Sequence, residues 1–284
     1  ASWLQIDSGL AKGDRVAIQM PNLMQYLVAC MGTLRAGMVV VNTNPLYTER
    51  ELEHQLNDSG ARVLVVQANV AEVASKVVSK TKVEQVVLTE IADLHPAPKR
   101  WLVNGVVKYV KKMVPKVHFP NVIKFNQALR RGASQAFTPV DVSLDDLAML
   151  QYTGGTTGLA KGAMLSHGNI VANVMQLDGF FETFGIEAEG SVFMQPLPVY
   201  HIYAFTISMY SLKKGAHTLF IPNPRDLGSV VDAFEQYKPT VFCGLNTLFV
   251  ALCNDPRFQS LAFENLALTM SGGMALTQDA AERW

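Results

Sequence analysis

The sequence is most informative at residues 152–163, which read Tyr152-Thr153-Gly154-Gly155-Thr156-Thr157-Gly158-Leu159-Ala160-Lys161-Gly162-Ala163. Four glycines, three threonines and one lysine stand in this stretch. Glycines let backbone N–H groups turn toward an anion, while threonine hydroxyls and a lysine ammonium add donors and positive charge. The stretch follows an apolar run at residues 147–150 and precedes a helical pattern at residues 166–184. We interpret it as a loop between a strand and a helix that binds the phosphates of a nucleotide.

The loop differs from the common P-loop of kinases and GTPases. That motif ends in Gly-Lys followed by Ser or Thr, whereas Lys161 here precedes Gly162. An ordinary kinase or GTPase is therefore disfavoured. A flexible linker is the alternative, but a linker does not need paired threonines or a lysine flanked by small residues.

On both sides of this loop in the sequence, short apolar runs typical of β-strands alternate with helical patterns. The predicted strands cover residues 15–19, 38–41, 62–67, 85–89, 147–152, 191–195, 216–221, 240–243 and 266–270. Helical patterns at residues 22–36 and 48–58 are each closed by a glycine, and Thr48 and Glu51 have the spacing of a capping box. The alternation predicts an α/β fold of doubly wound, mostly parallel sheets with helices on both faces.

The composition is typical of a soluble globular protein. Of its 284 residues, 49% are apolar and 17% are charged, which allows a buried core. The formal net charge is +0, so the chain as a whole does not attract nucleic acid. Cys30, Cys243 and Cys253 form neither a metal-binding pair nor a disulfide framework, and we expect reduced core thiols in a cytosolic protein. No apolar run reaches the roughly 18 residues of a membrane-spanning helix.

The segment between residues 94 and 140 is basic. It has no acidic residue and nine basic ones, namely Lys99, Arg100, Lys108, Lys111, Lys112, Lys116, Lys124, Arg130 and Arg131. The valines that recur there at helical spacing are Val103, Val106, Val107, Val110 and Val114. Three lysines fall mostly on the opposite side, which predicts a basic amphipathic helix. Docking on anionic lipid and an ordinary solvated surface helix are both consistent with this pattern.

The phosphate loop, with residues 164–169 after it, resembles the signature of the acyl-adenylate-forming superfamily, which includes acyl-CoA synthetases, luciferases and the adenylation domains of peptide synthetases. Within this superfamily the chain looks most like a bacterial long-chain fatty acyl-CoA synthetase. The similarity extends to residues 35–47, 51–60, 196–202, 223–226 and 272–274, so essentially the whole chain is covered.

This resemblance implies the large N-terminal domain of the acyl-adenylate-forming fold over residues 1–284, with a basic insertion at about 94–140. The family also carries a Tyr-Gly-x-Thr-Glu motif and a small C-terminal domain with an adenylating lysine, and neither occurs here. We therefore expect a fragment that lacks the C-terminal domain and is inactive on its own.

The resemblance also implies the reaction. ATP and a long-chain fatty acid form an acyl-adenylate and pyrophosphate, and the thiol of coenzyme A then displaces AMP. Thr153, Thr156 and Thr157 would contact the β and γ phosphates, with Thr153 also on Mg²⁺, and Lys161 would act catalytically by offsetting the repulsion between two anions. The residues expected to bind the nucleotide are Tyr152, Thr153, Gly154, Gly155, Thr156, Thr157, Gly158, Lys161, Gly162, Gly272, Gly273 and Met274.

Two further residues are expected at the substrate. By resemblance, His201 borders the substrate carboxylate, where an imidazole can donate a hydrogen bond to a developing negative oxygen, although a histidine beside aromatic residues is often a core residue. Phe205 stands where some long-chain relatives carry an aromatic gate to the acyl tunnel, and a plain core aromatic is equally consistent. Gly272 and Gly273 follow a predicted strand, where glycines permit close approach of a ligand.

Two alternatives to a fatty acyl-CoA ligase remain open. One is a noncatalytic nucleotide-binding or membrane-docking module, and the other is an adenylate-forming ligase for a different carboxylic acid. The expected location is cytoplasmic, with peripheral contact on the inner face of the cell membrane through residues 99–116 as one interpretation. Relatives are often homodimers, which makes a homodimer a further expectation.

Overall fold

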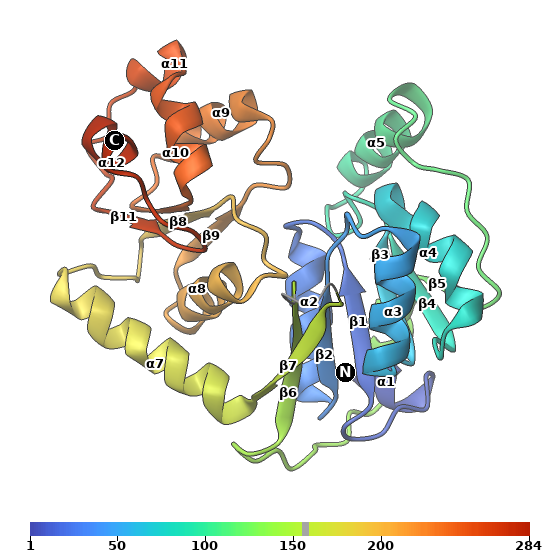
Figure 1. Ribbon diagram of the computed structural model, residues 1–284. Coiled ribbons are helices and arrows are strands. Elements are labelled where there is room, and N and C mark those ends of the chain that lie inside the picture. The colour runs from blue at the N-terminus through green and yellow to red at the C-terminus, as the bar shows by residue number, and fades with distance from the viewer. Residues whose placement is uncertain (155–158) are drawn as a thin grey trace. The chain divides into compact units, whose positions relative to one another are not determined.

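A computed structural model describes residues 1–154 and 159–284 of the chain (Figure 1). The chain forms two compact units, Ala1–Asn169 and Ile170–Trp284. Each unit is built on its own sheet, with seven strands in the first and four in the second.

The first unit has the strand order β5-β4-β3-β1-β2-β6-β7. The strands are β1 Arg15–Gln19, β2 Val39–Thr43, β3 Val63–Gln67, β4 Gln85–Thr89, β5 Val122–Lys124, β6 Leu147–Thr153 and β7 Lys161–Ser166. Every pair is parallel except β6 with β7, which is antiparallel. The chain passes from β1 to β2 on one side and then to β3 on the other, so the winding direction reverses beside β1. Ligands of such sheets bind outside the carboxyl ends of the strands near this reversal.

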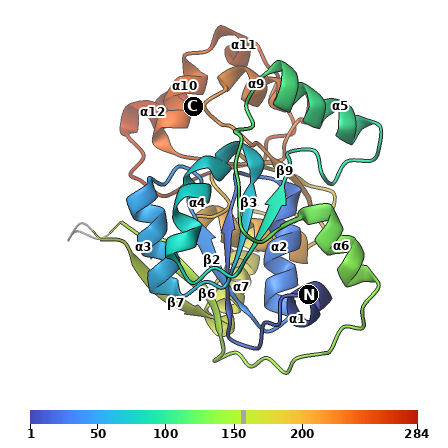
Figure 2. The same cartoon turned by 90° about the vertical axis from the view of Figure 1, so that its right-hand side faces the viewer.

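Helices cover both faces of this sheet. They are α1 Ser2–Ile6, α2 Met24–Arg35, α3 Glu49–Ser59, α4 Ala71–Val77, α5 Lys99–Gly105 and α6 Phe125–Ala133, with short 3-10 turns Ala68–Val70 and Val78–Lys80 and a π-helical turn η3 Val106–Val110. Figure 2 shows α3 and α4 on one side of the sheet and α1, α2 and α6 on the other. Leu52, Leu56 and Ala74 form a core with Leu64 and Val66 of β3. Burial on both faces explains why the central strands read as continuous apolar runs.

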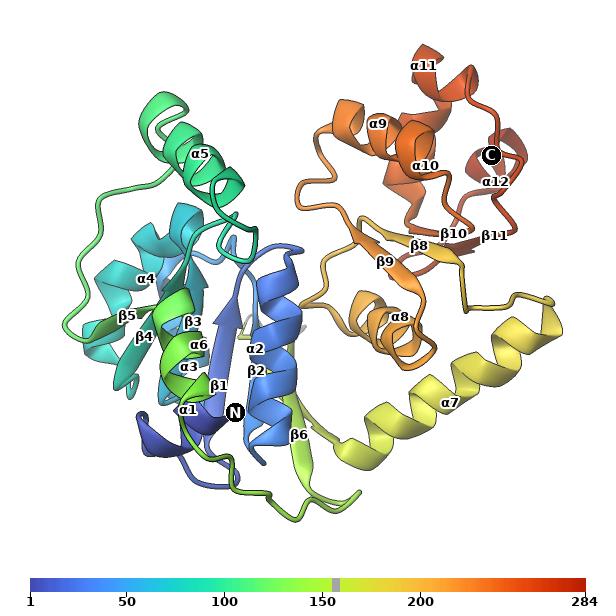
Figure 3. The ribbon, with the colours of Figure 1, turned by 180° about the vertical axis from the view of Figure 1, so that it is seen from behind.

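The second unit holds a parallel sheet of order β11-β10-β8-β9. Its strands are β8 Val192–Gln195, β9 His217–Phe220, β10 Val241–Gly244 and β11 Leu268–Ser271, and its helices are α7 His167–Thr183, α8 Ile202–Lys213, α9 Leu227–Tyr237, α10 Asn246–Cys253, α11 Pro256–Gln259 and α12 Gln278–Arg283. Figure 3 shows α8 on one side of the strands and α9 and α10 on the other. Along β10, Val241 and Cys243 join the core under α7 and α8, while Phe242 joins the core under α9 and α10. This alternation is the period of two that a strand imposes.

The structure confirms the predicted fold class and each of the nine predicted strands, within one to two residues at most ends. The capping box of α3 is present as well. Thr48 N donates to the Glu51 carboxylate at 2.8 Å, and Glu51 N donates to Thr48 Oγ1 at 3.4 Å. Gly60 closes the helix in the left-handed conformation, with φ of 62°.

The helix predicted at residues 166–184 is confirmed as α7, but the strand between the phosphate loop and this helix was not predicted. The loop does not lead directly into a helix, because residues 161–166 form β7, which pairs antiparallel with β6 before α7 begins at His167. The loop is therefore the tip of a β-hairpin. The strand was not predicted because it is an edge strand without a buried residue and its apolar run is only Ala163-Met164-Leu165.

The basic segment also differs from its prediction. Helical structure covers α5 and η3 but ends at Val110, and Lys112 has a φ of 51°, so Val114 lies outside the helix. No residue of α5 or η3 is fully buried. Val103, Val106 and Val107 are only partly buried, and Val110 is exposed.

All three cysteines are buried and unpaired, as predicted. Burial raises the pKa of the Cys30 and Cys243 thiols to about 12. Within the described residues, no helix has the length and apolar character needed to span a membrane.

Candidate functional site

The phosphate-loop hairpin brings two predicted residues together. In the ladder between β6 and β7, Thr153 lies opposite Lys161, and Tyr152 lies opposite Gly162. Directly opposed residues of an antiparallel pair project to the same face, so the Thr153 hydroxyl and the Lys161 ammonium flank the base of the tip together. Both residues are exposed. Since β6 runs parallel to β2, the tip lies at the carboxyl edge of the sheet, where ligands of this architecture bind.

Four residues predicted to bind phosphate lie outside the described residues. They are Gly155, Thr156, Thr157 and Gly158. Their contacts with ATP stay a prediction. The structure describes the loop on both sides of these four residues, at Thr153 and Gly154 before them and at Leu159 to Lys161 after them.

Tyr152 supports the hairpin from within. Its side chain is 7% exposed, and its hydroxyl donates to Asp58 Oδ2 of α3 at 2.5 Å. Burial, and then the hydrogen bond to Asp58, raise the pKa of the Tyr152 phenol, so it remains a neutral donor. A Cβ at Gly162 would lie 3.0 Å from the ring of Tyr152. Because Gly162 has no side chain, β7 can lie close to the Tyr152 ring.

A second residue of α3 holds the other side of the tip. His54 Nε2 lies 3.0 Å from the carbonyl oxygen of Ala160, directly before β7, and serves as its donor. His54 and Asp58 are four residues apart and share one face of α3. This helix thus contacts both ends of the loop. The sequence analysis assigned neither residue a role, because their contacts with the loop join segments about a hundred residues apart in the chain.

Buried polar side chains fix β6 against β2 below the tip. Tyr26 Oη donates to Asn42 Oδ1 at 2.6 Å, and Asn42 Nδ2 donates to Gln151 Oε1 at 2.9 Å. Gln55 of α3 donates to the backbone oxygen of Asn42 at 2.8 Å. Buried hydrogen bonds of this kind favour one register over its neighbours. They set where Tyr152 and Thr153 leave the sheet.

In the second unit, His201 stands at the start of α8. It is the N-cap residue, its backbone N–H donates to the oxygen of Pro198 at 2.9 Å, and its side chain is exposed. The interpretation as a core histidine is therefore wrong for this structure. An exposed imidazole at a helix N-terminus is placed where that helix favours negative charge.

Phe205, one turn further along α8, is fully buried. The aromatic gate to an acyl tunnel stays a prediction for this residue. Its position fits the plain core aromatic that the sequence left open.

The glycine pair after β11 packs against α8. A Cβ at Gly272 would lie 2.6 Å from Cζ of Tyr203, and Gly273 has a φ of 83°, which favours glycine. Met274 follows with half of its side chain exposed. This end of β11 and the first turn of α8, with His201, are therefore neighbours within the second unit. Tyr203, to which the sequence analysis gave no role, is partly buried, and its buried hydroxyl has no hydrogen-bond partner among the described residues.

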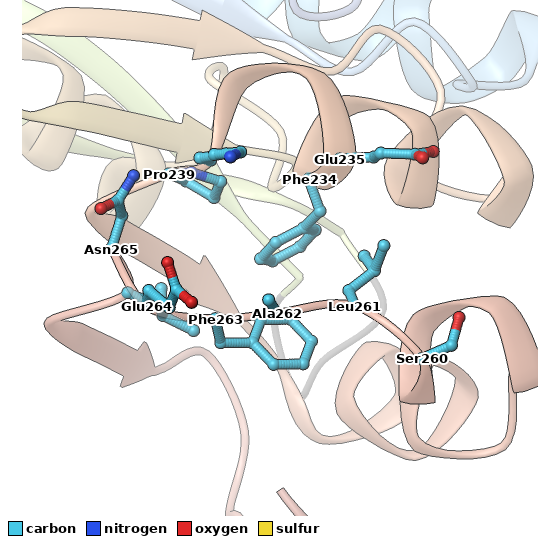
Figure 4. Close-up of a pocket in the computed structure, with 11 residues that line it drawn as sticks. Phe234, Glu235, Pro239, Ser260, Leu261, Ala262, Phe263, Glu264 and Asn265 are labelled. Carbon is cyan, nitrogen blue, oxygen red and sulfur yellow. The ribbon is translucent and has the colours of Figure 1, made fainter.

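Among the described residues, several cavities lie away from these predicted residues, three of which bear on the argument. One, of about 230 Å³, opens beside α9 in the second unit (Figure 4). There the rings of Phe234 and Phe263 have centroids 6.1 Å apart. A second, of about 260 Å³, is an apolar groove under α1, α2 and α6. The third lies beside α5 in the first unit.

Mg²⁺ would depend mainly on the nucleotide. Among the described residues, no group of three or more His, Cys, Asp or Glu side chains could hold a metal. The exposed hydroxyl of Thr153 is a hard oxygen ligand of the kind Mg²⁺ accepts. A single such ligand fits an ion that arrives with substrate phosphates rather than one caged by the protein.

Comparisons with known proteins agree with this geometry. The family model described as AMP-binding enzyme matches residues 1–284. The chain is 50% identical over 287 residues to a long-chain-fatty-acid–CoA ligase of Escherichia coli O157:H7, covering 100% of this chain and 51% of that protein. It is 33% identical to the ligase of the same name from Bacillus subtilis (strain 168), with coverages of 100% and 50%.

A solved structure has the same fold. The crystal structure of a long-chain-fatty-acid-CoA ligase from Archaeoglobus fulgidus matches with a TM-score of 0.76 and 25% identity, over 99% of this chain and 50% of that one. The chain thus spans about half the length of the curated relatives it matches.

Proposed function

Because the chain belongs to the AMP-binding enzyme family, we propose that its protein activates long-chain fatty acids with ATP and transfers them to coenzyme A. The carboxylate oxygen attacks the α-phosphorus of ATP and pyrophosphate leaves, which gives an acyl-adenylate. The sulfur of coenzyme A then attacks the acyl carbon and AMP leaves. Support comes from the names of the relatives and, in this chain, from one observation: Thr153 and Lys161 face each other at the base of a glycine-rich tip.

The hairpin would act by electrostatics and positioning. A carboxylate and a triphosphate repel each other, and Lys161 supplies a positive charge on the side of the tip where Thr153 supplies a hydroxyl. Mg²⁺ bound with the nucleotide would neutralise further phosphate charge, with Thr153 as the protein ligand. His54 and Asp58 hold both ends of the tip, so these groups keep their places as charge develops.

His201 would act on the acyl side of the reaction. Its exposed imidazole at the N-terminus of α8 can donate a hydrogen bond to an oxygen of the substrate carboxylate or of the adenylate. Gly272 and Gly273 would let the ligand lie along the backbone at the end of β11, next to that turn.

The assay for this proposal is exchange of labelled pyrophosphate into ATP by the whole protein. Exchange that depends on long-chain fatty acids supports it. Exchange with only amino acids or aryl acids would assign the protein to another adenylate-forming ligase. ATP binding without exchange for any acid would favour the noncatalytic nucleotide-binding module. Inactivity of residues 1–284 by themselves stays a prediction of the same scheme.

Peripheral membrane contact is the second part of the proposal. The specific observation is that Trp101, Leu102, Tyr109 and Val110 of α5 and η3 are all more than 60% exposed beside basic residues. We place this contact, through residues 99–116, at the anionic inner face of the cell membrane.

A homodimer is a separate expectation. Sedimentation of the whole protein would measure its oligomeric state.

A further inference from the structure

A cavity beside α5 gathers basic side chains that the proposed reaction does not use. It has a volume of about 410 Å³ and lies between α5, η3, the end of β4 and the start of α6. Figures 1 and 3 show α5 standing beyond the ends of the strands of the first unit. Its basic lining residues are Arg100, Lys108, Lys124 and Arg130. They come from three separate parts of the chain, so the fold rather than the local sequence assembles them.

The acidic groups of this cavity offset only part of its basic charge. Its two carboxylates belong to Glu90 and Asp93. Asp93 Oδ2 accepts from Glu90 N at 2.8 Å and from Thr89 Oγ1 at 3.1 Å. Glu90 Oε2 accepts from Asn104 Nδ2 at 3.1 Å. Among the described residues, none of the four basic side chains has an ion-pair partner within 4.0 Å. The cavity therefore keeps an excess of positive charge and unused donors, which suit a phosphate.

Large apolar side chains surround the same place. Trp101 and Tyr109 line the cavity and are 65% and 72% exposed, while Leu102 and Val110 beside them reach 69% and 74%. Water disfavours so much exposed apolar surface in one short segment. Aromatic and aliphatic side chains next to lysines and arginines match the boundary between lipid headgroups and acyl chains.

We infer that this cavity binds the phosphodiester of an anionic phospholipid while the apolar side chains around it enter the bilayer. The inference rests on the proposed membrane contact and adds a headgroup site to it. The guanidinium groups of Arg100 and Arg130 offer paired donors for phosphate oxygens, and Lys108 and Lys124 add charge. The partner is a lipid rather than a soluble phosphate compound, because the exposed apolar side chains around the cavity would gain no contact from the latter.

Cosedimentation of the whole protein with vesicles tests this site. The vesicles contain phosphatidylcholine alone or phosphatidylcholine with phosphatidylglycerol. The pocket variant carries Lys108→Gln and Lys124→Gln, and the matched control carries Lys111→Gln and Lys116→Gln, which remove the same charge from exposed lysines that do not line the cavity. The pocket variant should bind phosphatidylglycerol vesicles on the order of 30-fold more weakly than the wild type. The control should lose clearly less.

Equal losses of vesicle binding in the pocket variant and the control would show that the cavity is not a headgroup site and that a diffuse basic surface binds the vesicles. Equal binding of the wild type to both vesicles would overturn the headgroup site too.

A third variant separates this inference from the proposed membrane contact. Trp101→Ser with Leu102→Ser should weaken binding to both vesicles and keep the preference for phosphatidylglycerol. If the wild type binds neither vesicle, the membrane contact itself fails and the headgroup site fails with it. If the apolar variant loses binding while the pocket variant keeps it, the contact stands and the site fails. Pyrophosphate exchange by each variant serves as the check of folding.

Discussion

At the scale of single residues, the hydrogen bond between Tyr152 and Asp58 decides how firmly the hairpin tip is held. We expect Tyr152→Phe to raise the KM for ATP several-fold in the whole protein while the KM for fatty acid changes little. It should also lower the free energy of unfolding by about 1 kcal/mol, because a hydrogen bond to a carboxylate is lost. Steady-state kinetics and denaturant unfolding measure the two effects.

Asp58→Asn is the conservative comparison for that change. The amide oxygen can still accept from the Tyr152 hydroxyl. This variant should keep most of the ATP affinity that Tyr152→Phe loses. An equal rise in the KM for ATP in both variants, or an equal rise in the KM for fatty acid, would contradict the positioning role of this pair.

The close contact between Gly272 and Tyr203 gives a second prediction at this scale. Gly272→Ala should destabilise the protein by about 1–3 kcal/mol, since the new methyl group would overlap the Tyr203 ring. Gly179→Ala in α7 is the control, because nothing lies within 4 Å of a Cβ there. Alanine favours a helix interior, so that change should leave stability equal or higher. A harmless Gly272→Ala, measured by thermal unfolding, would mean that the end of β11 does not pack on α8 as described.

At the scale of elements, the N-terminus of α3 provides a pH-dependent prediction. Hydrogen bonds from the backbone and side chain of Thr48 lower the pKa of Glu51. A lowered folded-state pKa contributes stability above the ordinary glutamate pKa, and this contribution is lost as the pH falls through the folded value. Thr48→Ala should cost about 1 kcal/mol at neutral pH.

Denaturant unfolding between neutral and acidic pH measures this contribution. The difference between Thr48→Ala and the wild type should shrink as Glu51 is protonated. Thr48→Ser, which keeps the hydroxyl, should follow the wild type. A difference that stays constant down to low pH would show that the Glu51 carboxylate takes no part in the cap.

Sequence reasoning succeeded for elements whose burial leaves a pattern. Central strands such as β1 and β3 are apolar on both faces, and α3 carries its own start and stop signals. It missed the edge strands β5 and β7, because each has only two or three consecutive apolar residues, which make too short a pattern. The end of the basic helix at Val110 was also missed, since no packing partner makes its valines necessary. At the site, the string of residues 152–163 was visible, whereas its supports on α3 depend on contacts across the fold.

At the scale of the whole molecule, the division into two units had no signal in the sequence. The boundary between Asn169 and Ile170 lies inside the continuous helix α7, so no polar linker marks it. The two separate sheets and their strand orders likewise follow from pairing between distant segments, which a local pattern cannot specify.

The buried thiols report on the integrity of both units. Cys30 lies in the first unit and Cys243 and Cys253 in the second, and all three are buried. Because burial raises the pKa of Cys30 and Cys243 to about 12, little thiolate exists at mildly alkaline pH. A thiol reagent should react slowly with the native protein and titrate these three cysteines at once in denaturant. Rapid reaction of Cys30 or Cys243 in the native state would contradict the described packing.

The most direct measurement for the proposed activity is fatty-acid-dependent pyrophosphate exchange by the whole protein carrying Lys161→Gln. Lys82→Gln, at another exposed lysine of the first unit, is the control. Loss of a charge that stabilises the transition state should lower the exchange rate about a hundredfold, while the control keeps the wild-type rate. If Lys161→Gln exchanges pyrophosphate as fast as the wild type, the hairpin does not bind the reacting phosphates and the proposed role of Lys161 is wrong.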